Sequence, residues 1–117
     1  MRTEEISSEP TLVVRRLILK PGESTAWHID ACRRFSVVVS GDCLGIEFEG
    51  SELVLDLPVH AGLAGWDEPE PRVHRATNTG ATPYEEITLF LRSDPGIVPQ
   101  PVSPPPAAEA DGPDTFR

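Results

Sequence analysis

The chain has 117 residues, the usual size of a single domain, so its length argues against two full domains. Its 10 basic and 19 acidic residues give a formal net charge of −9. This balance argues against nucleic-acid binding, because phosphates are bound by clustered Lys and Arg. No segment approaches the roughly 18 consecutive apolar residues of a membrane span, and the N-terminus lacks the apolar run of a secretory signal. We therefore expect a cytoplasmic protein that contacts neither nucleic acid nor membrane.

Two cysteines, Cys32 and Cys43, are too few for a disulfide framework. In a reducing cytosol we expect two free thiols packed as small hydrophobic groups. A Cys32–Cys43 bridge is the less favoured alternative.

In chain order, residues 1–10 form an acidic lead-in that could add an edge strand. Alternating apolar residues separated by Gly, Pro, Ser and Asp predict short strands about ten residues apart, and no helix. These are Thr11–Lys20, Thr25–Asp30, Phe35–Val39, Leu44–Phe48, Glu52–Leu57, Val73–Asn78 and Tyr84–Arg92. Pro58–Pro71 is predicted to be a longer loop. Seven or eight such strands indicate an antiparallel sandwich or barrel, and an edge strand of so small a domain favours a homodimer.

Residues 93–117 hold seven of the thirteen prolines, including Pro104-Pro105-Pro106. Such a composition offers little apolar surface to offset the entropy of ordering, which predicts a disordered Pro-rich tail. A docking segment for a proline-recognising partner is the alternative. The predicted organisation is thus a lead-in over 1–10, one domain over 11–92 and a tail over 93–117.

Two stretches resemble the motifs of the cupin family. The segment from Gly22 through His28 and Asp30 to Gly41 is similar to the first motif, which runs glycine, five residues, His-x-His, a glutamate and a second glycine. The segment from Gly65 to Asn78 is similar to the second motif, with Pro69 five residues before His74. The resemblance covers Leu12–Arg92 and implies an all-β, jelly-roll barrel with a ligand pocket.

The chain also departs from the family pattern. Asp30 stands in place of the second histidine, and Arg34 or Phe35 in place of the ligand glutamate. Pro71 replaces a glycine that usually comes three residues before the second-motif histidine. The resemblance therefore supports the fold better than it supports the metal site.

His28 and Asp30 lie two residues apart on a predicted strand, so both side chains point to the same face. If His74 joins them from another strand, two imidazoles and one carboxylate form the ligand set of many non-haem iron sites. One hypothesis is therefore a divalent metal (iron, manganese, nickel or zinc) held by these three residues. The protein would then be an oxygenase, decarboxylase or isomerase of a small organic acid.

The favoured hypothesis starts from Arg34, which falls on the His28 face if no bulge intervenes. A guanidinium there would pair with Asp30 and repel a metal, leaving a site without a cofactor. Arg34 would then hold the anion of a small-molecule ligand, while His28 and His74 supply hydrogen bonds. Such a protein senses or sequesters an acidic metabolite, and whether it catalyses any reaction stays open.

Other residues carry weaker signals. Arg72 and Arg75 flank His74 and could assist it, although surface ion pairs are the favoured reading for both. His60 is expected to be exposed and idle, and Asn78 to bond its own turn. The sequence lacks a phosphate-binding loop, a Gly-x-Ser-x-Gly nucleophile turn and a Cys-x-x-Cys pair.

Overall fold

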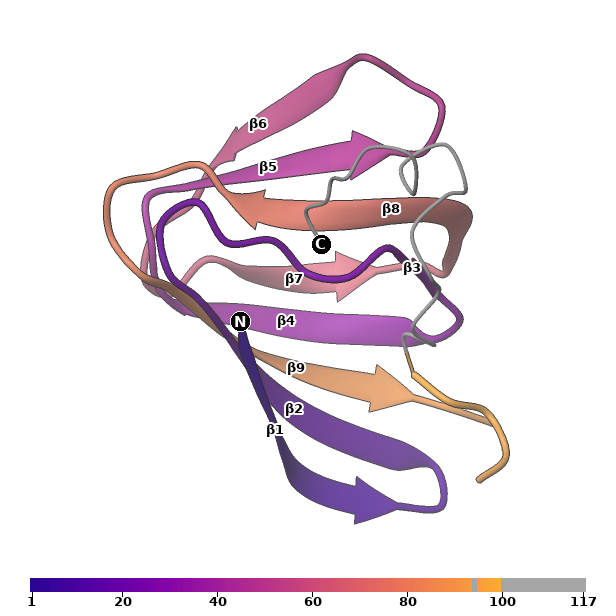
Figure 1. Ribbon diagram of the computed structural model, residues 1–117. Helices are drawn as coiled ribbons and strands as arrows, with labels where there is room; N and C mark the ends of the chain where they lie inside the picture. The colour runs from indigo at the N-terminus through magenta and orange to yellow at the C-terminus, as the bar shows by residue number, and fades with distance from the viewer. Residues whose placement is uncertain (94, 100–117) are drawn as a thin grey trace.

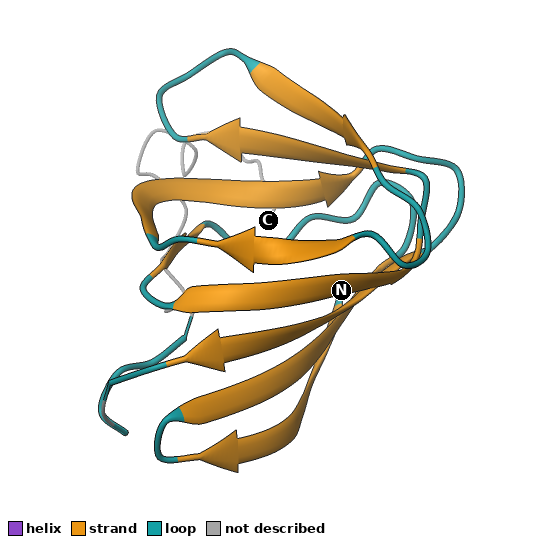
Figure 2. Cartoon of the chain, turned by 180° about the vertical axis from the view of Figure 1, so that it is seen from behind, coloured by secondary structure: helices purple, strands orange, loops and turns teal. Residues whose placement is uncertain are grey.

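A computed structural model describes residues 1–93 and 95–99 of the chain. These residues form strands joined by turns and contain no helix (Figures 1 and 2), so no helix among them could span a membrane. The nine strands are β1 (Arg2–Glu9), β2 (Leu12–Leu19), β3 (His28–Asp30), β4 (Arg33–Ser40), β5 (Cys43–Phe48), β6 (Val54–Pro58), β7 (Ala64–Asp67), β8 (Glu70–Asn78) and β9 (Tyr84–Leu91).

The strands make two antiparallel sheets, with the orders β1-β2-β9-β4-β7 and β3-β8-β5-β6. The chain passes from one sheet to the other at every connection except β1–β2 and β5–β6. This alternation wraps the two sheets around a common interior, as in a jelly roll. The predicted all-β barrel is confirmed.

The strand pattern differs from the prediction at β7 and β3. Ala64–Asp67 lies within the predicted loop, yet it pairs with β4 from Ala64↔Val37 to Asp67↔Arg34. Its apolar alternation is limited to Ala64 and Trp66 on either side of Gly65, too short to predict a strand, so the neighbouring strand brings it into the sheet. The strand predicted over Thr25–Asp30 is regular only from His28.

The N-terminal lead-in is an edge strand, since β1 pairs with β2 from Arg2↔Ile18 to Glu9↔Leu12. At the other end of the domain, residues 95–99 lie against the barrel. Arg92 donates to the carbonyl of Ile97 at 3.1 Å, and Arg15 donates to that of Pro99 at 3.2 Å. The remainder of the predicted tail, residues 94 and 100–117, lies outside the described residues.

Most of the buried apolar residues form two clusters. One contains Leu19, Val38, Leu44 and Tyr84, and the other contains Val13, Cys32 and Phe90. Both cysteines are free thiols, as expected, and Cys32 is buried.

The turn after β8 is closed by the buried Asn78. Its Nδ2 donates to the carbonyls of Thr82 and Leu19, both at 2.9 Å, and its Oδ1 accepts from Gly80 N at 2.9 Å. The prediction that Asn78 bonds its own turn is confirmed. The bond to Leu19 also ties this turn to the end of β2, which no local pattern indicated.

Candidate functional site

Three buried side chains that could ligate a metal converge inside the barrel. Strand β3 carries His28 and Asp30 on its inner face, and β8 carries His74 directly opposite His28. The two imidazole centroids are 4.5 Å apart, and His74 Nε2 lies 2.8 Å from Asp30 Oδ2. One ligand atom from each of the three lies within 4.8 Å of the others. The two-residue spacing on β3 and the pairing with β8 thus create the cluster expected from the sequence.

Backbone carbonyls fix the orientation of both imidazoles. His28 Nδ1 lies 2.8 Å from the carbonyl oxygen of Ala26, and His74 Nδ1 lies 2.7 Å from that of Arg72. A carbonyl can only accept a hydrogen bond, so the network assigns a proton to each Nδ1. Each Nε2 therefore faces the cluster, which is the arrangement that metal-binding histidines use.

Arg34 reaches the cluster from β4, in the opposite sheet. Its Nη2 lies 3.1 Å from Asp30 Oδ2, and its Nη1 donates to the carbonyl of Glu68 at 3.2 Å. The guanidinium is mostly buried, with 16% of the side chain exposed. Asp30 Oδ2 is thus shared by Arg34 and His74, whereas Asp30 Oδ1 faces His28 Nε2 at 3.6 Å. The ion pair considered as an alternative to a metal is present.

The surroundings of the cluster shift the pKa values of its two histidines in opposite directions. Burial lowers the pKa of His28 below its ordinary value, and the Ala26 carbonyl and Asp30 do not offset this. Burial also acts to lower the pKa of His74, but the hydrogen bonds to Asp30 and to the Arg72 carbonyl outweigh it and raise that pKa. Burial acts to raise the pKa of Asp30, but His74 and Arg34 hold it below its usual value. The arrangement favours a carboxylate, an imidazolium at His74 and a neutral imidazole at His28.

The cluster forms one wall of a cavity of about 510 Å³, referred to below as the main cavity. Its other walls are mostly apolar and come from both sheets: Val38, Leu44, Ile46, Phe48, Val59 and Ala76. Its rim includes Leu57, Leu63 and Trp66, which are 40–48% exposed. An apolar chamber with one charged wall suits a small organic molecule with a polar head.

Acidic side chains also line the main cavity, but two of them already have partners. Glu70 accepts two hydrogen bonds from the Arg72 side chain, and Glu68 accepts one from Arg33. Asp67, at the outer end of β7, is exposed. Glu86, on β9, also lines the main cavity, so the positive charge of Arg34 is confined to its own wall.

Arg72 and Arg75 do not line the main cavity. Arg72 lies over the ring of Phe48 at 4.0 Å, and Arg75 lies over the ring of Trp27 at 4.6 Å. Each is also held by a glutamate, as expected for surface ion pairs. His60 is exposed, and its imidazole lies 3.1 Å from the neighbouring Ala61 carbonyl.

The sequence reasoning missed a polar row on the inner face of β9. Glu86 Oε2 accepts from Thr88 Oγ1 at 2.7 Å, and Thr88 in turn lies 3.0 Å from Ser36 Oγ. Glu86 also accepts a hydrogen bond from Tyr84. The signal was available, since Glu86 shares the alternation of Tyr84, Thr88 and Phe90 and must face the same way as these buried residues.

The three converging residues fit a divalent metal in their donor chemistry. Two nitrogens and one carboxylate suit iron, zinc and related ions, and the anchored Nδ1 atoms already direct both imidazoles inward. Two contacts oppose such an ion: Arg34 competes for Asp30 Oδ2, and His74 must release its Nε2 proton from the same oxygen before that nitrogen can ligate.

No protein-family model and no curated protein matches the sequence. Solved structures do match. A cupin domain from Bordetella pertussis is similar with a TM-score of 0.69 and 17% identity, over 79% of this chain and 93% of that one. A double-stranded β-helix protein from Klebsiella pneumoniae has a TM-score of 0.62 and 22% identity, over 86% and 84%.

An oxalate oxidase in complex with the substrate analogue glycolate is also similar, with a TM-score of 0.55 and 25% identity. The likeness covers 75% of this chain but 45% of that protein. The strand order, the enclosed interior and these likenesses together show that this chain has the cupin fold, the double-stranded β-helix.

Proposed function

We propose that this protein binds a small organic anion in the main cavity, with Arg34 and His74 as its charged anchors and His28 as a hydrogen-bonding partner. The observation that carries the proposal is that Arg34 and His74 share a single carboxylate, Asp30. One negative charge faces two positive groups whenever His74 is protonated. The surplus positive charge on this wall attracts an anion.

The surroundings of this charged wall favour the same conclusion. Arg34 and His74 are mostly buried, so an anion beside them is little screened by solvent. A charge-assisted hydrogen bond is worth about 1.5–3 kcal/mol, and the apolar walls can bury the remainder of the ligand. The ligand class is therefore a carboxylic acid with a short apolar body.

Isothermal titration with a panel of short monocarboxylates tests the proposal. We expect binding to the wild type and a loss of about tenfold to a hundredfold in Arg34→Ala. Arg33→Ala is the matched control, because Arg33 is exposed, pairs with Glu68 and lies outside the lining of the main cavity. Uncharged alcohols of the same length should bind more weakly. Equal affinities for acids and alcohols, or equal losses in both variants, would contradict the proposal.

A metal-dependent reaction on a small organic acid, as an oxygenase, decarboxylase or isomerase, is the second candidate function. The specific observation in its favour is the carbonyl anchoring of both Nδ1 atoms, which points two Nε2 atoms at Asp30. His28, Asp30 and His74 would hold the ion, which would supply Lewis acidity or a redox centre. Arg34 would then leave Asp30 and bind the acid group of the substrate.

Metal content separates the two candidates. Untagged protein purified without chelator is analysed by plasma mass spectrometry beside His28→Ala and Asp30→Ala. Near-stoichiometric iron, manganese, nickel or zinc that is lost in both variants would support the metal-dependent enzyme. Protein that contains no metal and takes none up on titration would eliminate that candidate.

We further propose that the protein acts in the cytoplasm as a homodimer. The two free thiols, Cys32 and Cys43, suit a reducing compartment. Among the described strands β6 pairs with β5 alone, which leaves its outer edge open with exposed apolar residues, the kind of edge that pairs with a second copy.

A further inference from the structure

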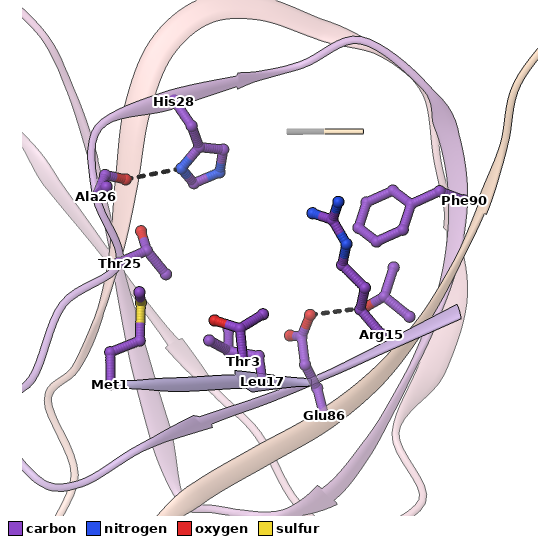
Figure 3. Close-up of a pocket in the computed structure, with 10 residues that line it drawn as sticks. Met1, Thr3, Arg15, Leu17, Thr25, Ala26, His28, Glu86 and Phe90 are labelled. Carbon is purple, nitrogen blue, oxygen red and sulfur yellow. Dashed lines mark hydrogen bonds between the residues drawn. The ribbon is translucent and has the colours of Figure 1, made fainter. Parts of the chain in front are cut away.

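A second cavity, of about 280 Å³, lies between β1, β2 and β9 and the segment that leads into β3 (Figure 3). We refer to it as the rear cavity. It adjoins the main cavity, with which it shares His28, Thr25, Leu17 and Glu86 as lining residues. Arg34, Asp30 and His74 do not line it.

Arg15 projects into the rear cavity, where it meets no counter-charge within residues 1–93 and 95–99. It follows the inward alternation of Val13 and Leu17 on β2, and Figure 3 shows its guanidinium extending into the open space beside Phe90. Among the described residues its partners are the Pro99 carbonyl at 3.2 Å and the Phe90 ring at 5.7 Å, and no carboxylate. A guanidinium has five N–H donors, so most of them remain available to a ligand.

The neighbouring Arg16, which points outward, provides a comparison with an arginine in surface ion pairs. Arg16 points to the other face of β2, where it pairs with Glu4 at 3.0 Å and with Glu85 at 3.3 Å. Acidic residues outnumber basic ones in the sequence by 19 to 10. The lack of a carboxylate beside Arg15 in the described part of the chain is therefore not explained by a shortage of acids.

Glu86 supplies the opposite charge in the same cavity. Its carboxylate accepts hydrogen bonds from Tyr84 and from Thr88, and it pairs with no cation among the described residues. A carboxylate can accept about four hydrogen bonds, so capacity remains on the side that faces the cavity. Figure 3 shows Glu86 and Arg15 bordering the same open space.

Arg15 and Glu86 are close in the sheet but do not pair with each other. Arg15 lies opposite Thr88 and Glu86 lies opposite Leu17, which makes the two charged residues diagonal neighbours on β2 and β9. Burying each charge costs desolvation free energy. Because Arg15 and Glu86 remain apart, no contact between them offsets that cost. A ligand placed between them can offset both.

From this geometry we infer that the rear cavity binds a small zwitterion, with its carboxylate on Arg15 and its ammonium group on Glu86. A simple anion would be attracted by Arg15 and repelled by Glu86, and a simple cation would meet the reverse. A molecule that bears both charges is favoured at both ends. This inference does not rest on the proposed function, because it uses neither Arg34 nor His74.

The experiment uses probes that separate the two charges. Glycine, β-alanine and 4-aminobutyrate are zwitterions of increasing charge separation, whereas butyrate and butylammonium each carry one charge. Binding to the full chain is followed by amide chemical-shift titration, with shifts at Thr3, Ala26 and Thr88, which line the rear cavity alone, marking that site. We expect at least one zwitterion to bind about tenfold or more tightly than either single-charge probe.

Matched variants assign the two charges. Arg15→Gln should lose about tenfold or more in zwitterion affinity, and Arg15→Lys should retain part of it. Glu86→Gln should remove the advantage of the zwitterion over butyrate. Arg16→Gln and Glu85→Gln, which change the adjacent outward residues, should bind like the wild type. Arg34→Ala should also leave rear-cavity binding intact, which separates this site from the main cavity.

The inference is overturned if no zwitterion shifts the rear-cavity amides at tens of millimolar, or if Arg15→Gln binds as the wild type does. Butyrate bound as tightly as 4-aminobutyrate would also overturn it, since Glu86 would then make no contribution. Circular dichroism and unfolding midpoints of each variant identify any loss that comes from misfolding, and Arg15→Lys retains the charge and packing if Arg15→Gln does not fold.

Discussion

At the scale of single residues, Asp30 is the centre of the candidate site. It is 2% exposed, and its Oδ2 lies 2.8 Å from His74 Nε2 and 3.1 Å from Arg34 Nη2. Removing one charge from a buried network costs more than the network contributes as a whole, because the remaining charges lose their partner. The stability of this region therefore depends on the carboxylate.

We predict that Asp30→Asn lowers the free energy of unfolding by about 3–5 kcal/mol, since it leaves Arg34 buried without a counter-charge. Urea denaturation measures the change. Asp56→Asn provides the control, because Asp56 is exposed and its change should cost less than about 1 kcal/mol. Equal effects in the two variants would show that Asp30 is not a buried charge partner.

The opposite pKa directions of His28 and His74 give a second prediction at this scale. In metal-free protein, NMR titration of the imidazole Cε1 protons should place the midpoint of His74 above the ordinary 6.5 and that of His28 below it. A raised pKa stabilises the fold fully below pH 6.5, and this contribution disappears as the pH rises through the folded-state value. A lowered pKa acts in the other direction, because protonating the unfolded chain below pH 6.5 reduces stability.

The two effects can be separated by substitution. In His28→Gln only the His74 effect remains, so stability should decline as the pH rises above 6.5. In His74→Gln the His28 effect remains, so stability should decline as the pH falls below 6.5. Coincident midpoints for the two imidazoles in the wild type would contradict the electrostatic description of the site.

At the scale of strands and turns, glycines decide where the sheets can turn. Gly41 joins β4 to β5 with φ at 139°, and a Cβ there would lie 2.8 Å from Cδ1 of the Tyr84 ring. Gly50 joins β5 to β6 with φ at 81°, and a Cβ there would meet nothing within 4 Å. Both positions need a positive φ, but only at Gly41 would a Cβ also clash with a neighbouring side chain.

We therefore predict that Gly41→Ala destabilises the fold by about 2–4 kcal/mol, through backbone strain together with displacement of the core residue Tyr84. Gly50→Ala should cost only about 1–2 kcal/mol, from backbone strain alone. Thermal and urea unfolding of the two variants measures the difference. A cost at Gly41 no greater than that at Gly50 would show that the Tyr84 ring moves aside freely.

At the scale of the whole molecule, the strands that the structure describes leave the apolar sheet edge at β6 uncovered. Strand β6 is the edge of its sheet and is exposed along its whole length. Leu53, Val54 and Leu55 are 66%, 44% and 43% exposed. Exposed edges of this kind are where sheets of two copies pair.

We predict that the chain sediments as a dimer. Leu55→Lys should raise the dissociation constant of the dimer at least tenfold, because a Lys on the paired edge must be desolvated. Ile6→Lys is the matched control, because Ile6 is 49% exposed on β1, the edge of the other sheet. A monomer at all concentrations, or a greater effect at Ile6 than at Leu55, would refute a dimer through β6.

Local patterns in the sequence determined the class of the fold and half of the candidate site. The period of two along a strand places His28 and Asp30 on one face whatever the partner strand is, and turn residues mark most strand ends. The cupin resemblance added His74 and the barrel. Local patterns did not predict strand β7, because a short segment with Gly65 becomes a strand only when β4 offers its hydrogen bonds.

The Arg34–Asp30 contact and the rear cavity depended on which strands lie side by side or face one another. Arg34 lies only four residues after Asp30, but the chain changes sheet at residues 31–32, so their contact depends on how β3 and β4 are placed in the two sheets. The rear cavity likewise exists because β2 pairs with β9, some 70 residues later in the chain, and brings Arg15 and Glu86 to one wall. Side-chain direction is a local property of a strand, whereas the partner that a side chain meets is decided by contacts between distant segments.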